Sequence, residues 1–104
     1  MSSSPVQPVI CETVDEAHYR LTGVLDRDTV PAFWSDKANW LPKGTTYTVA
    51  LSGLERIDSA GMAMLLHLRR YASEQNHQLI WAEVPDQLNT LLKLSNVDTL
   101  FYQG

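Results

Sequence analysis

The stretch Ile57-Asp58-Ser59-Ala60-Gly61 decides how the rest of the chain is interpreted. It follows an apolar run and opens the segment with the most regular helical pattern, so a carboxylate, a hydroxyl and a glycine lie together at a helix N-terminus. A helix N-terminus carries partial positive charge and free backbone N–H groups, and it can therefore receive an anion or a partner's backbone. We expect Ser59 to cap this helix, because a serine hydroxyl can accept a hydrogen bond from a first-turn N–H.

The neighbours of Ser59 have simple structural roles and possible functional ones. Asp58 is either a loop carboxylate satisfied by nearby N–H groups or the group that orients the Ser59 hydroxyl toward a partner. Gly61 favours close packing of the helix against backbone or sheet. Ser59 is also a candidate for phosphorylation, since the helix dipole would stabilise the added charge while Asp58 would oppose it.

The helix expected at residues 59–75 has two different faces. One face is assigned to the core and carries Gly61, Met64, Leu65, Leu68, Tyr71, Ala72 and Gln75. The opposite face carries Ser59, Met62, Ala63, Leu66, Arg70 and Ser73. Met62 and Leu66 lie one turn apart below Ser59, and ordinary surface is the simplest explanation for two such side chains. Beside Ser59 and Arg70, however, they also fit a small protein-interaction patch.

The other segments alternate between strand and helix patterns. Residues 9–13 and 17–22 predict an opening hairpin. Asp28 or Thr29 is expected to cap a helix that has Pro31 in its first turn and stops at Pro42 and Gly44. Further elements are expected as strands at 47–51 and 78–82, a helix from Pro85 to Ser95, and a short strand or helical turn at 97–101.

This order predicts an α/β fold. Right-handed crossovers make the later strands parallel, so we expect a mixed β-sheet with an N-terminal hairpin at or near an edge and with packed α-helices. In such sheets the loops at the carboxyl ends of the strands gather binding residues. The strand at 47–51 leads into the loop that holds Asp58 and Ser59.

The composition excludes several classes of function. The chain has 104 residues, 44% of them hydrophobic and 19% charged, which suits one modest domain. A net charge of −4, with only 8 scattered Lys and Arg residues, argues against a nucleic-acid partner. No apolar stretch approaches the roughly 18 residues of a membrane span, and the beginning lacks the pattern of a signal peptide. We therefore expect a cytoplasmic protein without direct membrane insertion.

No constellation of residues indicates catalysis. His18, His67 and His77 do not join one another or Cys11 at metal-ligand spacing, so neither a metal nor a cofactor is expected. No Gly-rich phosphate loop or nucleophile elbow occurs, and no base accompanies Ser59 in the sequence. The pattern favours a binding protein over an enzyme.

The chain resembles the STAS domain, the fold of anti-sigma-factor antagonists and of the cytoplasmic parts of some anion transporters. The resemblance covers about residues 19–101. It is carried by Leu21-Thr22-Gly23-Val24-Leu25-Asp26, Ile57-Asp58-Ser59-Ala60-Gly61 and Leu91-Leu92-Lys93-Leu94-Ser95. It implies a single STAS domain over residues 9–104, after a flexible N-terminus of residues 1–8.

Within that family, the run from Gly61 to Leu68 resembles the small STAS subunit of the bacterial ABC transporter that maintains outer-membrane lipid asymmetry. This implies a non-catalytic subunit that binds the transporter's cytoplasmic ATPase and associates peripherally with the inner membrane through the complex. The implied partner-binding residues are Asp58, Ser59, Met62, Leu66 and Arg70.

The alternative is an anti-sigma factor antagonist regulated by phosphorylation of Ser59, with an anti-sigma factor kinase as partner. The simplest possibility is a scaffold in which Ser59 only caps its helix.

Overall fold

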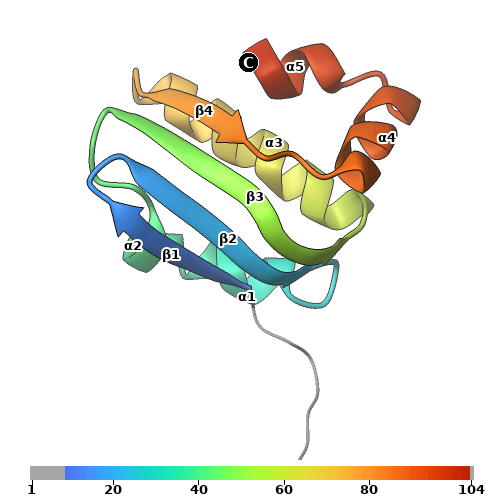
Figure 1. Ribbon diagram of the computed structural model, residues 1–104, viewed down its shortest axis with the longest axis horizontal. Helices are drawn as coiled ribbons and strands as arrows, with labels where there is room; N and C mark the ends of the chain where they lie inside the picture. The colour runs from blue at the N-terminus through green and yellow to red at the C-terminus, as the bar shows by residue number, and fades with distance from the viewer. Residues whose placement is uncertain (1–8, 104) are drawn as a thin grey trace, which may run out of the picture.

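Four strands form a single sheet in the order β1-β2-β3-β4 within residues 9–103, the part of the chain that the computed structural model describes (Figure 1). The flexible terminus expected at residues 1–8 lies outside this part. The strands are β1 (Ile10–Asp15), β2 (His18–Leu25), β3 (Thr46–Ile57) and β4 (Gln78–Ala82). β1 and β2 pair antiparallel, whereas the pairs β2–β3 and β3–β4 are parallel. The expected mixed sheet with its N-terminal hairpin at one edge is confirmed.

β3 is much longer than the strand expected at 47–51. Beyond that range Leu54 and Ile57 still point into the core. They follow Leu51 at spacings of three residues instead of two, because the register between β2 and β3 shifts in this part of the strand. Gly53 interrupts the apolar alternation in the sequence, but the fold requires it. A Cβ atom on Gly53 would lie 2.8 Å from the carbonyl oxygen of Leu21. The missing side chain therefore lets β2 and β3 approach where their register shifts.

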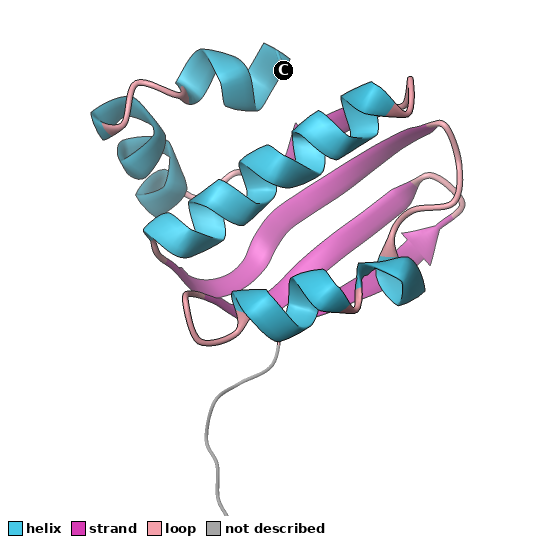
Figure 2. Cartoon of the chain, turned by 180° about the vertical axis from the view of Figure 1, so that it is seen from behind, coloured by secondary structure: helices cyan, strands magenta, loops and turns pink. Residues whose placement is uncertain are grey.

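Three helices cover the same face of the sheet in Figure 2: α1 (Val30–Ser35), α2 (Lys37–Trp40) and α3 (Ser59–Glu74). α3 agrees with the helix expected at 59–75. The single helix expected from Asp28 is instead divided at Asp36. The Asp36 carboxylate accepts a hydrogen bond from the Asn39 amide, a local bond that competes with helix continuation.

The first turn of α1 is held by a residue that the sequence pattern did not single out for capping. Neither Asp28 nor Thr29 caps α1 with its own side chain, which corrects the expectation. Instead, the Asp26 carboxylate accepts the backbone N–H groups of Asp28 and Thr29 at 2.9 and 3.1 Å. The Thr29 hydroxyl donates to the carbonyl of Val24 at 2.8 Å. Pro31 lies in the first turn, as expected.

Two more helices, α4 (Asp86–Leu94) and α5 (Asp98–Gln103), follow β4 and lie at its end of the sheet (Figure 1). Asn96 ends α4 with a positive φ of 56°. The Val97 N–H donates to the Leu92 carbonyl at 3.0 Å, which completes a Schellman-type ending. Of the two possibilities left open for 97–101, the structure has the helix. None of the helices within residues 9–103 is long and apolar enough to cross a membrane.

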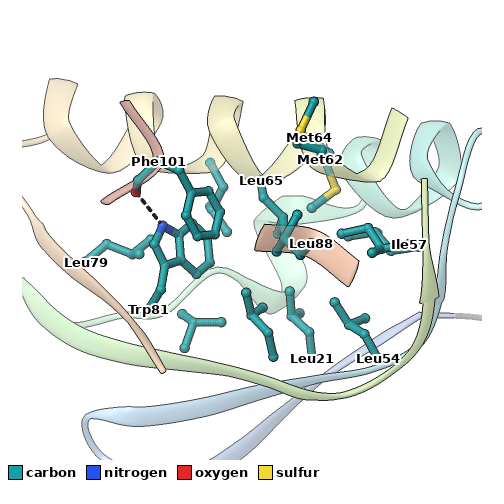
Figure 3. Close-up of a cluster of buried hydrophobic side chains, with 14 of the residues drawn as sticks. Leu21, Leu54, Ile57, Met62, Met64, Leu65, Leu79, Trp81, Leu88 and Phe101 are labelled. Atoms are coloured by element: carbon teal, nitrogen blue, oxygen red, sulfur yellow. Dashed lines mark hydrogen bonds between the residues drawn. The ribbon is translucent and has the colours of Figure 1, made fainter. Parts of the chain in front are cut away.

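The core lies between the sheet and the helices (Figure 3). Trp81 of β4 stacks on Phe101 of α5 with ring centroids 4.7 Å apart, and its indole N–H donates to the Phe101 carbonyl at 2.8 Å. This pair fastens the last helix to β4. The largest fully buried side chains are Phe101, Leu21, Leu25, Leu51, Leu65, Leu68, Leu88, Leu92 and Val49.

Candidate functional site

Asp58, not Ser59, caps α3. Oδ1 of Asp58 accepts the N–H groups of Ala60 and Gly61 at 2.9 and 3.1 Å, and Oδ2 accepts the Arg27 N–H at 3.3 Å. The expectation that Ser59 is the N-cap is wrong, because an N-cap needs a non-helical backbone. β3 ends at Ile57, so Asp58 is the extended residue before the helix, with φ −120° and ψ −170°.

This arrangement leaves the Ser59 hydroxyl available. Ser59 is the first residue of α3 and is exposed, and no hydrogen bond joins its hydroxyl to any group in residues 9–103. Both oxygens of Asp58 are occupied by backbone N–H groups, so the carboxylate serves the local structure and does not orient that hydroxyl. Ser59 therefore exposes an unbonded hydroxyl at the N-terminal end of α3.

Gly61 sets how closely α3 approaches the sheet. A Cβ atom at this position would lie 2.2 Å from the carbonyl oxygen of Leu25 and 2.8 Å from Cγ1 of Ile57. The same Leu25 carbonyl accepts the N–H of Asp58 at 3.3 Å. The packing role expected for Gly61 is confirmed, and the start of α3 is fixed against the end of β2.

An ion pair between a buried carboxylate and a mostly exposed guanidinium lies just after Leu25. Nη2 of Arg56 on β3 lies 2.6 Å from Oδ2 of Asp26, whose side chain is almost fully buried. The hydrogen bond from Arg56 is the largest of the effects that lower the pKa of Asp26. No local sequence pattern indicates this pair, because the two residues lie 30 positions apart and meet only through the parallel pairing of β2 and β3.

Met62 is part of the core. The sequence pattern placed it on the solvent face of α3, but only 7% of the residue is exposed. Figure 3 shows its side chain inside the buried cluster, close to Ile57 and Leu88. The expectation is wrong because α4, which carries Leu88, packs against α3 and widens the buried arc beyond the stripe that faces the sheet. Met62 therefore offers no exposed contact to a partner.

Leu66 and Arg70 remain on the accessible side of α3. Leu66 is half-buried, and it lines a hollow of ≈ 550 Å³ between α3 and α5 together with Arg70 and Leu100. Leu100 is 60% exposed and supplies the second apolar wall. The Arg70 side chain is exposed and forms an ion pair with Glu74 at 3.3 Å. The apolar patch is thus Leu66 with Leu100, where the sequence suggested Leu66 with Met62.

A second hollow, of ≈ 520 Å³, lies on the other flank of α3, where α1 approaches it. Trp34 and His67 line it from the two helices, with ring centroids 6.4 Å apart. Lys37 places its Nζ 4.8 Å from the centroid of the Trp34 ring, which adds a positive charge at this rim. We call the accessible strip between the two hollows the α3 surface: Ser59, Ala63, Leu66, His67 and Arg70.

The α3 surface has the composition of a contact surface. It combines small, apolar and basic side chains and is bordered by aromatic and aliphatic walls. Across the described part of the chain, no three His, Cys, Asp or Glu side chains gather in a way that could hold a metal ion.

Comparison with known proteins identifies the class. The family model described as the MlaB-type STAS domain matches residues 11–102, and the chain belongs to the STAS domain family. Its relatives include the Escherichia coli K12 and Shigella flexneri proteins named "Intermembrane phospholipid transport system binding protein MlaB". Each is 36% identical over 77 residues, which covers 74% of this chain and 77% of the relative.

A solved structure supports the fold independently. The unphosphorylated anti-sigma factor antagonist SpoIIAA superposes with a TM-score of 0.63 at 17% identity, covering 86% of this chain and 81% of that one. At this identity the likeness establishes the shared α/β fold. Both the STAS family and the fold predicted from the sequence are therefore confirmed.

Proposed function

We propose that the protein is a non-catalytic accessory subunit of an Mla-type phospholipid ABC transporter, similar to the MlaFEDB complex. Its partner is the transporter's cytoplasmic, MlaF-like ATPase, and it associates with the inner membrane through that complex. The identity to MlaB, whose name assigns it to an intermembrane phospholipid transport system, supports the type of system. The observation that carries the ATPase contact is the α3 surface, with the unbonded Ser59 hydroxyl at its end.

The geometry suits recognition of a folded partner. The Asp58 cap and the close contact of Gly61 with β2 hold the start of α3 in one position, so little conformational entropy is lost on binding. The hollow beside Leu66 can accept an apolar side chain, while Arg70 provides a charge at the rim. A subunit that binds the assembled ATPase more tightly than the free one shifts the population toward the assembled state.

Co-purification with an MlaF-like ATPase from the same organism tests this proposal. The double variant Ala63→Arg with Leu66→Glu places two charges on the α3 surface without touching the fully buried core. We expect at least about a tenfold loss of affinity for the ATPase, which corresponds to about 1.4 kcal/mol. The control is Val14→Glu on β1, which also replaces an exposed apolar residue by a charge.

The double variant and Val14→Glu should differ clearly in how much ATPase co-purifies with them. Retention of the ATPase by Val14→Glu and its loss from the double variant would support the α3 surface. An unchanged complex in the double variant would reject this surface as the binding site.

A phosphorylation switch is the second candidate, and the exposed, unbonded Ser59 hydroxyl is the observation that favours it. The local charge opposes it, because a phosphoryl group on Ser59 would stand beside Asp58, whose oxygens already occupy the nearby N–H groups. We therefore favour the transporter function.

Intact-mass measurement after incubation with a cognate anti-sigma factor kinase and ATP distinguishes the two functions. A mass increase of one phosphate, absent in Ser59→Ala, would favour the switch.

A further inference from the structure

A third hollow, of ≈ 580 Å³, follows the outer side of β4, between the C-terminal half of α3 and α5. β4 is the last strand in the sheet order, and within residues 9–103 no strand pairs with its outer side. Backbone groups alternate in direction along a strand. Gln78 donates its N–H inward to Thr45, so Leu79 and Trp81 direct their backbone N–H and C=O groups outward. The hollow therefore borders strand backbone without a neighbouring strand.

Arg69 of α3 lies in this hollow without a counter-ion. Its Nη2 donates to the Leu79 carbonyl at 2.8 Å, and its Cζ lies 5.8 Å from the centroid of the Trp81 ring. Its Nε is closed off from solvent and has no hydrogen-bond partner among the described residues. No carboxylate in that part of the chain forms an ion pair with it. Burial lowers the pKa of Arg69, since water no longer solvates the guanidinium fully.

The charge around Arg69 is unusual for this protein. The chain carries a net charge of −4, yet the hollow is lined by Arg69 and His77 and contains no Asp or Glu. Tyr102 of α5, 46% exposed, forms an aromatic wall opposite α3. A half-buried cation without a counter-ion is costly, and an incoming carboxylate would offset that cost with a bidentate pair. The hollow is thus complementary to a negatively charged ligand.

We propose that this hollow binds a short acidic segment of a partner protein. A carboxylate of the segment pairs with the Arg69 guanidinium, and its extended backbone lies along the outer side of β4. Two-fold pairing of β4 with a second copy is disfavoured, because it brings two Arg69 side chains toward each other. Neither Ser59 nor Leu66 of the α3 surface lines this hollow, so the proposal does not require the ATPase contact. Arg69 and Ser73 line both this hollow and the hollow beside Leu66.

An amide NMR titration of the full chain tests the proposal. The probe is a short synthetic peptide of alternating Glu and Val residues, and its matched control carries Gln in place of every Glu. We expect the Glu peptide to shift the Leu79 amide, the Trp81 indole and the Arg69 side-chain N–H resonances, with a Kd of about 1 mM or tighter. The shifts should weaken as salt is added, because the pairing is electrostatic. Equal shifts with the Gln peptide, or none at β4, would overturn the proposal.

Neighbouring residues supply matched variants. Arg69→Gln should weaken binding of the Glu peptide about tenfold, whereas Arg70→Gln, one residue along and exposed, should leave it unchanged. Ser73→Glu places a carboxylate one helical turn from Arg69 on an exposed position, so it should also weaken binding, while Ser73→Gln should not. This second pair keeps the test valid if Arg69→Gln fails to fold.

Two further outcomes would count against the proposal. Equal effects of Arg69→Gln and Arg70→Gln would assign the binding to general surface charge. Inorganic phosphate serves as a third titrant, and shifts at Arg69 as large as those caused by the Glu peptide would identify a simple anion site. In either case the acidic-segment site would be rejected, and the ATPase co-purification result would be unaffected.

Discussion

The carbonyl oxygen of Leu25 lies 2.2 Å from the position that a Cβ atom on Gly61 would occupy. Leu25 is the last residue of β2 and Gly61 is in the first turn of α3, so this contact determines how the helix that carries the α3 surface meets the sheet. The backbone carbonyl cannot swing aside as a flexible side chain would. The position therefore tolerates no added methyl group without displacement of the helix.

Gly61→Ala should lower the free energy of unfolding by about 1–3 kcal/mol, because the new methyl group forces α3 away from β2. Gly44→Ala is the matched control, since a Cβ there would meet only the Thr46 carbonyl oxygen at 3.9 Å. Urea unfolding followed by circular dichroism measures both. Equal stability of the two variants would contradict the close contact.

Two alanine substitutions distinguish the capping role of Asp58 from the role of the exposed Ser59 hydroxyl. Asp58→Ala should cost about 0.5–2 kcal/mol of stability because it removes the cap of α3. Ser59→Ala should change stability by less than about 0.5 kcal/mol, as an exposed position without a hydrogen bond. Thermal unfolding measures both, and a larger loss for Ser59→Ala would return the capping role to the serine. In the ATPase co-purification, Ser59→Ala should weaken the complex while leaving the melting temperature nearly unchanged.

Met62 and Leu66 should respond in opposite ways to truncation. Met62→Ala should lower stability by about 2–5 kcal/mol because it opens a cavity in the core. Leu66→Ala should cost about 1 kcal/mol, since the side chain is only half-buried, and should weaken ATPase binding instead. Chemical denaturation and co-purification on the same two proteins distinguish packing from contact. A stable Met62→Ala protein that loses the ATPase would place Met62 back on the binding surface.

The pair of Asp26 and Arg56 should make stability depend on acid pH. The pKa of Asp26 is lowered chiefly by the hydrogen bond from Arg56, so its folded-state pKa lies below the unfolded value of about 3.9. The ionised carboxylate therefore stabilises the fold above about pH 4, and this contribution disappears as the pH falls through the folded-state pKa. Asp26→Asn should be less stable than wild type at about pH 7, and the difference should shrink toward about pH 2.

Urea midpoints across that pH range measure this dependence. Asp28→Asn, on an exposed side chain of the same loop, is the control. A stability difference for Asp26→Asn that stays constant with pH would show that the carboxylate acts through packing and not through its charge.

Phe101→Ala should detach α5, because it removes the ring that stacks on Trp81. Loss of a fully buried Phe costs about 3–5 kcal/mol. The Trp81 fluorescence should move to longer wavelength as its indole becomes hydrated. Thr99→Ala, exposed on the same helix, should change neither stability nor fluorescence. An unshifted emission spectrum in Phe101→Ala would indicate that α5 stays in place without the stack.

Local patterns predicted most of the elements and left the contacts between them open. β4 and the extent of α3 agree with the sequence, since strand alternation and helical periodicity are set by neighbouring residues. The choice of Ser59 as the cap was wrong because both Ser and Asp can cap a helix, so residue type alone does not distinguish Ser59 from Asp58. The end of β3 at Ile57 decides that Asp58 has the extended backbone of an N-cap. The division of the expected helix at Asp36 could not be predicted for a similar reason. The hydrogen bond from the Asn39 side-chain amide to the Asp36 carboxylate forms only in the folded turn.

By itself, the sequence determined the α/β class, the N-terminal hairpin, the parallel crossovers and the place of Ser59 at the start of α3. These features follow from residue types and spacings within a single element and from the handedness of short connections. Only the tertiary structure decided that α4 buries Met62, that α5 brings Leu100 beside Leu66, and that Asp26 meets Arg56. Each of these depends on elements that are distant in the chain and are brought together when the protein buries its apolar surface, so no local pattern records them.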